Sequence, residues 1–166
     1  MFLIHSPNFS SISQPDTMRL INLLPLALSL LPLISSKSYC PPKPACEKEQ
    51  AKIWNEFVDE LWIKKNVSLA FTTHVDPSYI QHNPFAPSGR QIAIDALTTI
   101  WPTLNSTIMH NGFSNNTGFL HYRGDGGGPY PQAIMDIFRF DGTCIMEHWD
   151  VDQSWSPNFT NPRALF

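Results

Sequence analysis

The chain has 166 residues, a size that suits one domain, and 42% of them are hydrophobic, which is enough to build a core. The formal net charge is −3. Because nucleic-acid binding relies on a basic surface, this charge gives no support for a DNA- or RNA-binding protein. The 15 prolines fall before residue 45, in loops and near the C-terminus. They are therefore expected to mark loops and the ends of elements, and they do not predict a disordered domain.

Residues 1–38 predict a leader that contains a secretory signal peptide. Met18-Arg19 precedes an apolar run over 20–34, and Ser35-Ser36-Lys37-Ser38 follows it. Two prolines interrupt the run, which is also shorter than the roughly 20 residues that a membrane-spanning helix needs. We therefore expect a cleaved signal, no stable membrane span, and a protein that is secreted or lies in the lumen of the secretory pathway.

Glycosylation and a disulfide bond are expected in that compartment. Sequons predict glycans at four asparagines, namely Asn66, Asn105, Asn115 and Asn158. The cysteines are Cys40, Cys46 and Cys144, and an odd number predicts one disulfide and one remaining thiol. A Cys40–Cys144 bond would tie the N-terminal tail to a C-terminal hairpin, whereas Cys40–Cys46 would close only a small loop, and the first is favoured. The spacing fits no zinc pattern, so no metal site is expected.

Helices dominate the first half of the chain. Residues 39–46 predict a Pro-rich linker, and the folded domain is expected over 47–166. Apolar residues at helical spacing predict a helix over 47–65, and Asn66 is suited to cap a second helix that runs to about His74. His74 is expected at the surface. An extended segment follows at 79–84, and a third helix is predicted from Ser88-Gly89 to Pro102.

The second half has the pattern of strands. Four are predicted, over 107–113, 118–123, 132–140 and 144–152. The Gly-rich segment 124–129 lacks the strand-loop-helix setting of a phosphate-binding loop and predicts a hairpin connection. Helices followed by consecutive strands indicate an α+β domain with helices on one side of an antiparallel sheet. If the sheet curls around the helices, a pocket opens between them.

Residues 136–153 carry ionisable groups where a half-buried hairpin should carry apolar ones. Asp136, His148 and Asp150 would each cost several kcal/mol if buried unpaired, so they predict a polar pocket or proton chemistry. Which of them share a face depends on the turn near Asp141-Gly142. A two-residue turn pairs Asp136 with Glu147 and separates it from His148 and Asp150. A three-residue loop ending in Gly142 places Asp136 opposite Met146 and puts the three ionisable groups on one face.

That shared face would suit acid–base chemistry. Apolar neighbours at Ile134, Phe138 and Met146 would form its walls, and a carboxylate in such surroundings can remove a proton from carbon next to a carbonyl. An imidazole can donate to the developing enolate oxygen. His121 and His82 are candidates to join the site.

Structural roles compete with each of these readings. Asp136 could pair with Arg139 or Arg123, Asp150 and Asp152 could be solvated at a strand end, and His82 could be a structural histidine. Asp125 and Glu147 are expected at the surface.

The motifs that carry these residues show a family resemblance over roughly residues 47–153. The run YIQHNP (79–84), then DIFRFDG (136–142), then EHWD (147–150) resembles the SnoaL-like group of the NTF2-like, or ketosteroid isomerase-like, superfamily. This resemblance implies an α+β cone in which helices pack inside a strongly curved sheet with a pocket at its open end. It also implies that Asp150 matches the acid/base aspartate of SnoaL-type cyclases. Asp136 stands where those cyclases have a histidine.

The resemblance further implies cofactor-free chemistry on a carbonyl compound: cyclisation, isomerisation, aldol-type closure or dehydration. The expected substrate is polyketide-derived or related to maleic anhydrides, as in fungal secondary metabolism, and the expected catalytic residues are Asp150, Asp136, His148, His82 and His121. Tyr79 joins Ile134, Phe138 and Met146 as an expected substrate contact. A secreted binding protein that uses the same pocket without catalysis is the alternative, and a homodimer paired through the sheet is a further expectation.

Overall fold

A computed structural model describes residues 37–166; the predicted signal peptide lies outside the described residues. Apart from the first strand, which precedes the third α-helix, the helices precede the strands, as the sequence pattern predicts. The elements in chain order are α1 (Glu47–Val58), a π-helical turn η1 (Asp59–Ile63), α2 (Val67–His74), β1 (Val75–Gln81), α3 (Arg90–Ile100), a 3₁₀ turn η2 (Trp101–Thr103), β2 (Asn105–Ser114), β3 (Thr117–Asp125), β4 (Gln132–Asp141) and β5 (Cys144–Ser154).

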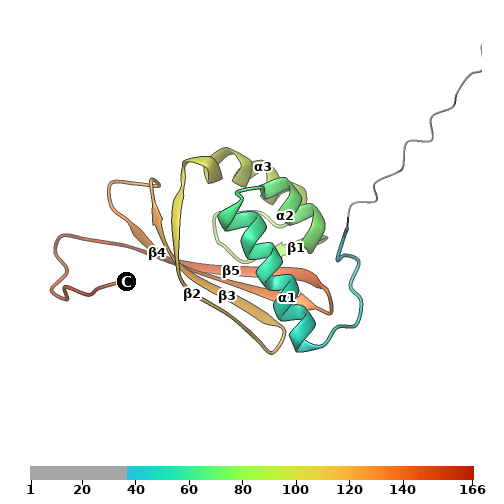
Figure 1. Cartoon of the computed structure of the whole chain (residues 1–166). Helices are drawn as coiled ribbons and strands as arrows, with labels where there is room; N and C mark the ends of the chain where they lie inside the picture. The colour runs from blue at the N-terminus through green and yellow to red at the C-terminus, as the bar shows by residue number, and fades with distance from the viewer. Residues whose placement is uncertain (1–36) are drawn as a thin grey trace, which may run out of the picture. The chain divides into compact units, whose positions relative to one another are not determined.

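The five strands form one curled, unclosed sheet in the order β1-β5-β4-β3-β2. Strands β2 to β5 pair antiparallel, whereas β1 pairs with β5 in parallel. The sequence predicted an extended segment near β1 but not its place in the sheet. Asp76-Pro77 lies inside β1, which is possible because β1 is an edge strand, where proline removes no ladder hydrogen bond that the sheet needs. Figure 1 shows the helices gathered on one side of this sheet.

The predicted long helix changes geometry at its C-terminal end. In η1 the Lys64 N–H donates to the Asp59 carbonyl oxygen, five residues back, at 2.8 Å. The Leu61 carbonyl oxygen accepts instead from the Trp101 indole N–H at 2.6 Å. This bond fixes the end of α3 against the turn. No helix among residues 37–166 is long and apolar enough to cross a membrane.

Aromatic side chains from α1 fill the core between the helices and the sheet. Trp54 and Phe57 are fully buried and pack at 5.5 and 5.2 Å between ring centroids against Phe138 of β4. Gly118 makes this possible, because a Cβ at that position of β3 would overlap the Trp54 indole. The core thus holds α1 across β3 and β4, where β4 carries Asp136.

The β4–β5 hairpin adopts neither of the two turns considered from the sequence. Asp141 pairs with Cys144, so the two turn residues are Gly142 and Thr143, and Gly142 takes a positive φ of 50°. The register then shifts between Arg139 and Phe140: Phe140 pairs with Ile145 and Arg139 with Glu147, which leaves Met146 as a bulge. The bulge produces the face that the three-residue loop would have given, by a different route.

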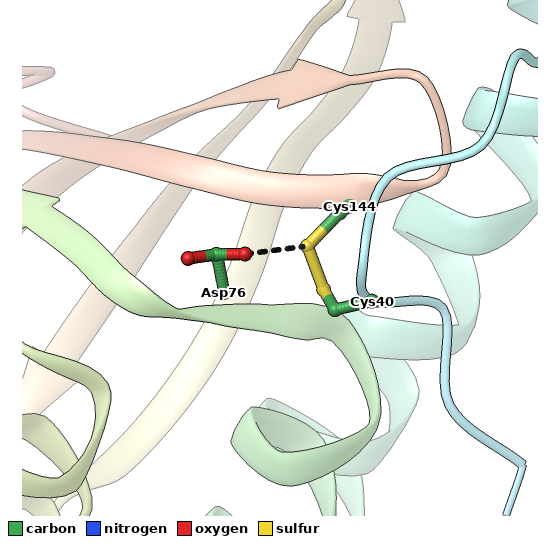
Figure 2. A group of neighbouring side chains, drawn as sticks. All are labelled: Cys40, Asp76 and Cys144. Atoms are coloured by element: carbon green, nitrogen blue, oxygen red, sulfur yellow. Dashed lines mark hydrogen bonds between the residues drawn. A yellow bond between two sulfur atoms is a disulfide. The ribbon is translucent and has the colours of Figure 1, made fainter.

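A disulfide joins Cys40 to Cys144 across 104 residues, as the sequence analysis favoured (Figure 2). Cys46 is an exposed free thiol. Asp76 approaches the Cys144 sulfur at 4.0 Å; because a disulfide sulfur carries no hydrogen, this is a contact and not a hydrogen bond. The same three side chains cluster closely enough to suggest a metal site, but bonded sulfurs lack the thiolate that metal ions require.

The segment before α1 packs on the domain through several polar contacts. The Tyr39 backbone N–H donates to the Thr73 carbonyl oxygen, and the Thr143 hydroxyl donates to the Tyr39 carbonyl oxygen at 2.6 Å. Lys43 and Thr143 exchange two further bonds. A side chain at Gly142 would collide with the Lys43 carbonyl, so the glycine allows this close approach. The predicted linker is therefore attached to the hairpin turn.

His74 is fully buried, which corrects its predicted place at the surface. It ends α2 beneath Tyr39, whose ring stacks on the imidazole at a centroid distance of 5.1 Å. His74 Nε2 lies 3.0 Å from Glu60 Oε2. Burial lowers the pKa of His74 to about 4 and raises the pKa of Glu60. At neutral pH, His74 is therefore neutral and donates its Nε2–H to Glu60.

The buried His74 predicts acid sensitivity of the fold. Because its pKa falls from 6.5 in the unfolded chain to about 4, the unfolded state binds more protons between these values. Stability should be complete above about pH 6.5 and fall toward pH 4 by up to about 3 kcal/mol. The raised pKa of Glu60 acts in the opposite direction. Urea unfolding between pH 7.5 and 4.5 measures the loss, and His74→Gln should flatten the pH dependence; an equally steep profile in that variant would contradict the assignment.

Candidate active site

A cavity of about 610 Å³ lies between the helices and the sheet, a size typical of small-molecule sites. Its wall is largely apolar and comes from η1, α2, α3, η2 and the strands. The larger contributors are Trp62, Phe71, Tyr79, Trp101, Tyr122 and Phe138. The polar groups come from β4, β5 and the end of β1, so the chemistry of the cavity is concentrated on one wall.

Asp136 and Asp150 are direct cross-strand partners on that wall. Phe138 and His148 form the next pair, so Asp136, His148 and Asp150 share the cavity face. Asp136 is 6% exposed and His148 is 9% exposed. His148 Nε2 lies 3.2 Å from Asp136 Oδ1, and the His148 ring stacks on Phe138 at a centroid distance of 4.3 Å.

The protonation of His148 can be followed through its hydrogen bonds. Gln81 Oε1 accepts from the Asn83 backbone N–H at 3.0 Å, while Gln81 Nε2 donates to the Tyr79 hydroxyl at 3.2 Å. The oxygen of Gln81 therefore faces His148 Nδ1, 3.0 Å away, and Nδ1 must carry a proton. One more proton must lie between Nε2 and Asp136, either on the acid or on the imidazole. In both cases the Asp136–His148 pair has no net charge.

Asp150 lines the cavity and has one oxygen without a hydrogen-bond partner in the described part of the chain. Its Oδ2 accepts from the Asn83 side-chain amide at 2.6 Å. Its Oδ1 is buried and has no hydrogen-bond partner among the described residues. A buried acceptor without a donor is costly, and such groups often belong to sites that a ligand completes.

Two buried tyrosines adjoin the carboxylates. Burial, and then the nearby charge of Asp136, raise the pKa of both the Tyr79 and the Tyr122 hydroxyl. Asp150 contributes to both shifts as well. Each phenol therefore keeps its proton at neutral pH and can act as a hydrogen-bond donor toward the acidic wall.

Three of the four predicted substrate contacts line the cavity: Tyr79, Ile134 and Phe138. The prediction for Met146 is wrong in its placement, because Met146 is the bulge residue of β5 and does not line the cavity. A bulge residue has no cross-strand partner, so strand alternation no longer determines its direction.

The predicted roles of His82 and His121 are not supported by their positions, since neither lines the cavity. His82 Nε2 lies 2.9 Å from Glu147, and its ring stacks on the exposed Trp149. His121 Nδ1 faces His110 Nδ1 at 3.0 Å. Alternation along extended backbone explains both outcomes, because Gln81 and Asn83 on either side of His82, and Tyr122 after His121, line the cavity.

The ion pairs of Asp136 with Arg139 or Arg123, which the sequence left open, do not form. Arg139 pairs with Glu147, and Arg123 pairs with Asp125 at 2.8 Å. Asp152 lines the cavity near its opening, is exposed, and accepts from Gln132 Nε2 at 3.0 Å. The solvated reading therefore fits Asp152 and does not fit Asp150.

Sequence reasoning missed the side chains that orient the acidic groups. Gln81 and Asn83 lie one residue to either side of His82, which drew attention for its imidazole. Tyr122 follows His121 in the same way. Alternation along an extended segment was the available signal: it puts the two flanking residues on one face and the histidine on the other.

Comparisons with known proteins bear on the fold. Scans against protein-family models and curated proteins find no match. Among solved structures, an NTF2-like protein of unknown function from Mesorhizobium loti aligns with a TM-score of 0.55 and 14% identity, over 68% of this chain and 98% of that one. Another from Cytophaga hutchinsonii aligns with a TM-score of 0.53 and 12% identity, over 67% and 93%.

The chain has the NTF2-like fold. A proposed SnoaL-like polyketide cyclase from Jannaschia sp. CCS1 also has this fold, with a TM-score of 0.51 and 13% identity over 63% of this chain and 88% of that one. The NTF2-like architecture predicted from the sequence is thus confirmed, with its helices on one side of a curled sheet. At these identities the likeness concerns the fold, and the reaction must be argued from the cavity.

Proposed function

We propose that this NTF2-like protein is a cofactor-independent enzyme that transfers protons on a small carbonyl compound. The observation that carries the proposal is the composition of one cavity wall. An Asp136–His148 pair, with Oδ1 and Nε2 3.2 Å apart, lies beside Asp150, whose buried Oδ1 has no partner among the described residues. A proton donor and a proton acceptor within one largely apolar cavity are the requirements for enolisation.

Each group has a distinct role in this proposal. Asp150 removes a proton from the carbon next to the carbonyl, and Asn83 orients its carboxylate. The shared proton of Asp136 and His148 stabilises the developing enolate oxygen, and Tyr122 can add a second donor. Gln81 keeps the Nδ1–H tautomer of His148 in place. The resulting enolate can isomerise, lose water or close a ring by aldol-type attack.

The substrate and the setting follow the same proposal. A largely apolar cavity of about 610 Å³ suits a polyketide-derived or maleic-anhydride-type secondary metabolite. Secretion is supported by the Cys40–Cys144 bond, since disulfides persist in oxidising compartments. All four sequon asparagines, Asn66, Asn105, Asn115 and Asn158, are exposed, so glycans could be attached without unfolding.

Proton exchange on a simple ketone tests the proposal without knowledge of the natural substrate. The purified protein should accelerate the exchange of the α-protons of 2-tetralone for deuterium in D₂O, which NMR follows directly. The reason is that exchange needs only the first step, proton removal by Asp150 with support of the enolate oxygen. Binding of 2-tetralone without any acceleration would reject the enzyme and favour the alternative, a secreted binding protein that uses the same cavity.

A further inference from the structure

The charged side chains that line the cavity are all of one sign, apart from His148. Three carboxylates, Asp136, Asp150 and Asp152, are among the described lining residues, and no Lys or Arg is. Lys65 is the basic residue bonded to the lining: its ammonium donates to the Leu104 carbonyl oxygen at 2.7 Å. Lys65 itself does not line the cavity.

The remaining basic groups of the neighbouring strands are also occupied elsewhere. Arg123 forms a two-bond pair with Asp125, at 2.8 and 2.9 Å. Arg139 pairs with Glu147, and neither arginine lines the cavity. Among residues 37–166, no Lys or Arg therefore lines the cavity to receive a carboxylate or phosphate.

The negative charge is concentrated at the middle and the opening of the cavity. Because the Asp136–His148 pair has no net charge, the two charges left are those of Asp150 and Asp152. These residues are two apart on β5 and so lie on the same face. A ligand that binds beside Asp150 therefore also meets the field of Asp152, in a partly desolvated space where charge–charge interactions are stronger than in water.

We propose that the cavity selects its ligands by charge: it accepts uncharged and cationic apolar compounds and rejects anions. The preferred ligand brings the C–H group next to its carbonyl to the Asp150 carboxylate, whose Oδ1 lacks a hydrogen-bond partner among the described residues. This inference rests on the proposed function for the identity of the site and narrows its substrate class. The substrate is an uncharged carbonyl compound, so a maleic anhydride would fit only in its closed form and not as the ring-opened dicarboxylate.

Three compounds of nearly the same shape but different charge test the inference. We would measure the binding of 2-naphthylmethanol, 2-naphthylmethylamine and 2-naphthoate to the full chain by calorimetry at pH 7.5. The alcohol should bind at least tenfold more tightly than the carboxylate, since roughly one to two orders of magnitude correspond to repulsion by two partly screened charges. The amine should bind at least as tightly as the alcohol.

The amine distinguishes repulsion by the negative charges of the cavity from the general cost of burying any charged ligand. If the amine and the carboxylate are both bound more weakly than the alcohol, desolvation explains the order and charge selection is overturned. Equal binding of carboxylate and alcohol would overturn it as well.

A substitution at Asp152 tests whether this residue contributes to the selection of ligands by charge. Asp152→Asn should reduce the ratio of the affinities for the alcohol and the carboxylate several-fold, because it removes the charge of Asp152 while Asp150 stays in place. An unchanged ratio would contradict the role of Asp152. Binding is measured without turnover. A protein that fails the proton-exchange test can therefore still bind the three compounds in the expected order of affinity, and a protein that passes it can bind them in another order. The result therefore stands apart from that of the proton-exchange test.

Discussion

The Asp150→Asn variant should lose proton-exchange activity by about 10²- to 10⁴-fold while keeping its fold, because a general base contributes about that much to a proton-transfer rate. An asparagine has the same shape as aspartate, and its side-chain oxygen can still accept from the Asn83 amide. What it lacks is a basic oxygen in place of the unpaired Oδ1. The rate of α-proton exchange on 2-tetralone, measured by NMR, gives the loss.

Thermal unfolding accompanies this measurement. The melting temperature of Asp150→Asn should equal or exceed that of the native chain, because the substitution removes the charge of a partly buried carboxylate that is only partly hydrogen-bonded. Asp141→Asn serves as the matched control, since Asp141 lies exposed at the end of β4, away from the cavity. Full activity in Asp150→Asn would reject its role as the base, and equal loss in Asp141→Asn would point to a nonspecific effect.

Removal of the Cys40–Cys144 bond should have the largest effect on stability. In the unfolded chain the bond closes a loop between residues 104 positions apart, and loops of that length are expected to contribute about 2–5 kcal/mol. Cys40→Ser is the milder choice of variant, because Cys144 is fully buried and its thiol can remain in place as a small apolar group. Urea unfolding should show the loss as a lower midpoint.

Two controls accompany the Cys40→Ser variant. Cys46→Ser should change stability by less than about 0.5 kcal/mol, because Cys46 is exposed and unbonded. Reduction of the native chain with dithiothreitol should reproduce the effect of Cys40→Ser and add nothing to the variant itself. Equal unfolding midpoints for Cys40→Ser and the native chain would show that the bond does not stabilise the fold.

The helices and most strands could be predicted because their signals are local. The apolar spacing of α1 and the Asn66 cap of α2, which accepts from the Leu69 N–H at 3.1 Å, depend on residues close together in sequence. The place of β1 could not be predicted in the same way. Its parallel pairing with β5 joins residues some 67 positions apart, as for Gln81 and His148, and Pro77 argues locally against a strand.

The acidic wall was predictable in part. Asp136, His148 and Asp150 drew attention because they are ionisable groups in a strand that should bury apolar ones, and the structure brings them together. Their partners Gln81 and Asn83 are uncharged, so composition does not distinguish them from loop residues. Hydrogen-bond partners of this kind are visible only once two distant strands have been placed side by side.

The bulge at Met146 gives the hairpin an unusual sensitivity to length. Side chains alternate along β5, so the number of residues before Glu147 decides whether every later position faces the cavity or the solvent. Loss of Met146 alone would let Glu147 follow Ile145 in regular alternation and would keep His148 and Asp150 on the cavity face, whereas loss of both Ile145 and Met146 would turn them outward. Among relatives of this chain, insertions and deletions in that stretch should therefore separate those that keep the acid–base wall from those that retain only the fold.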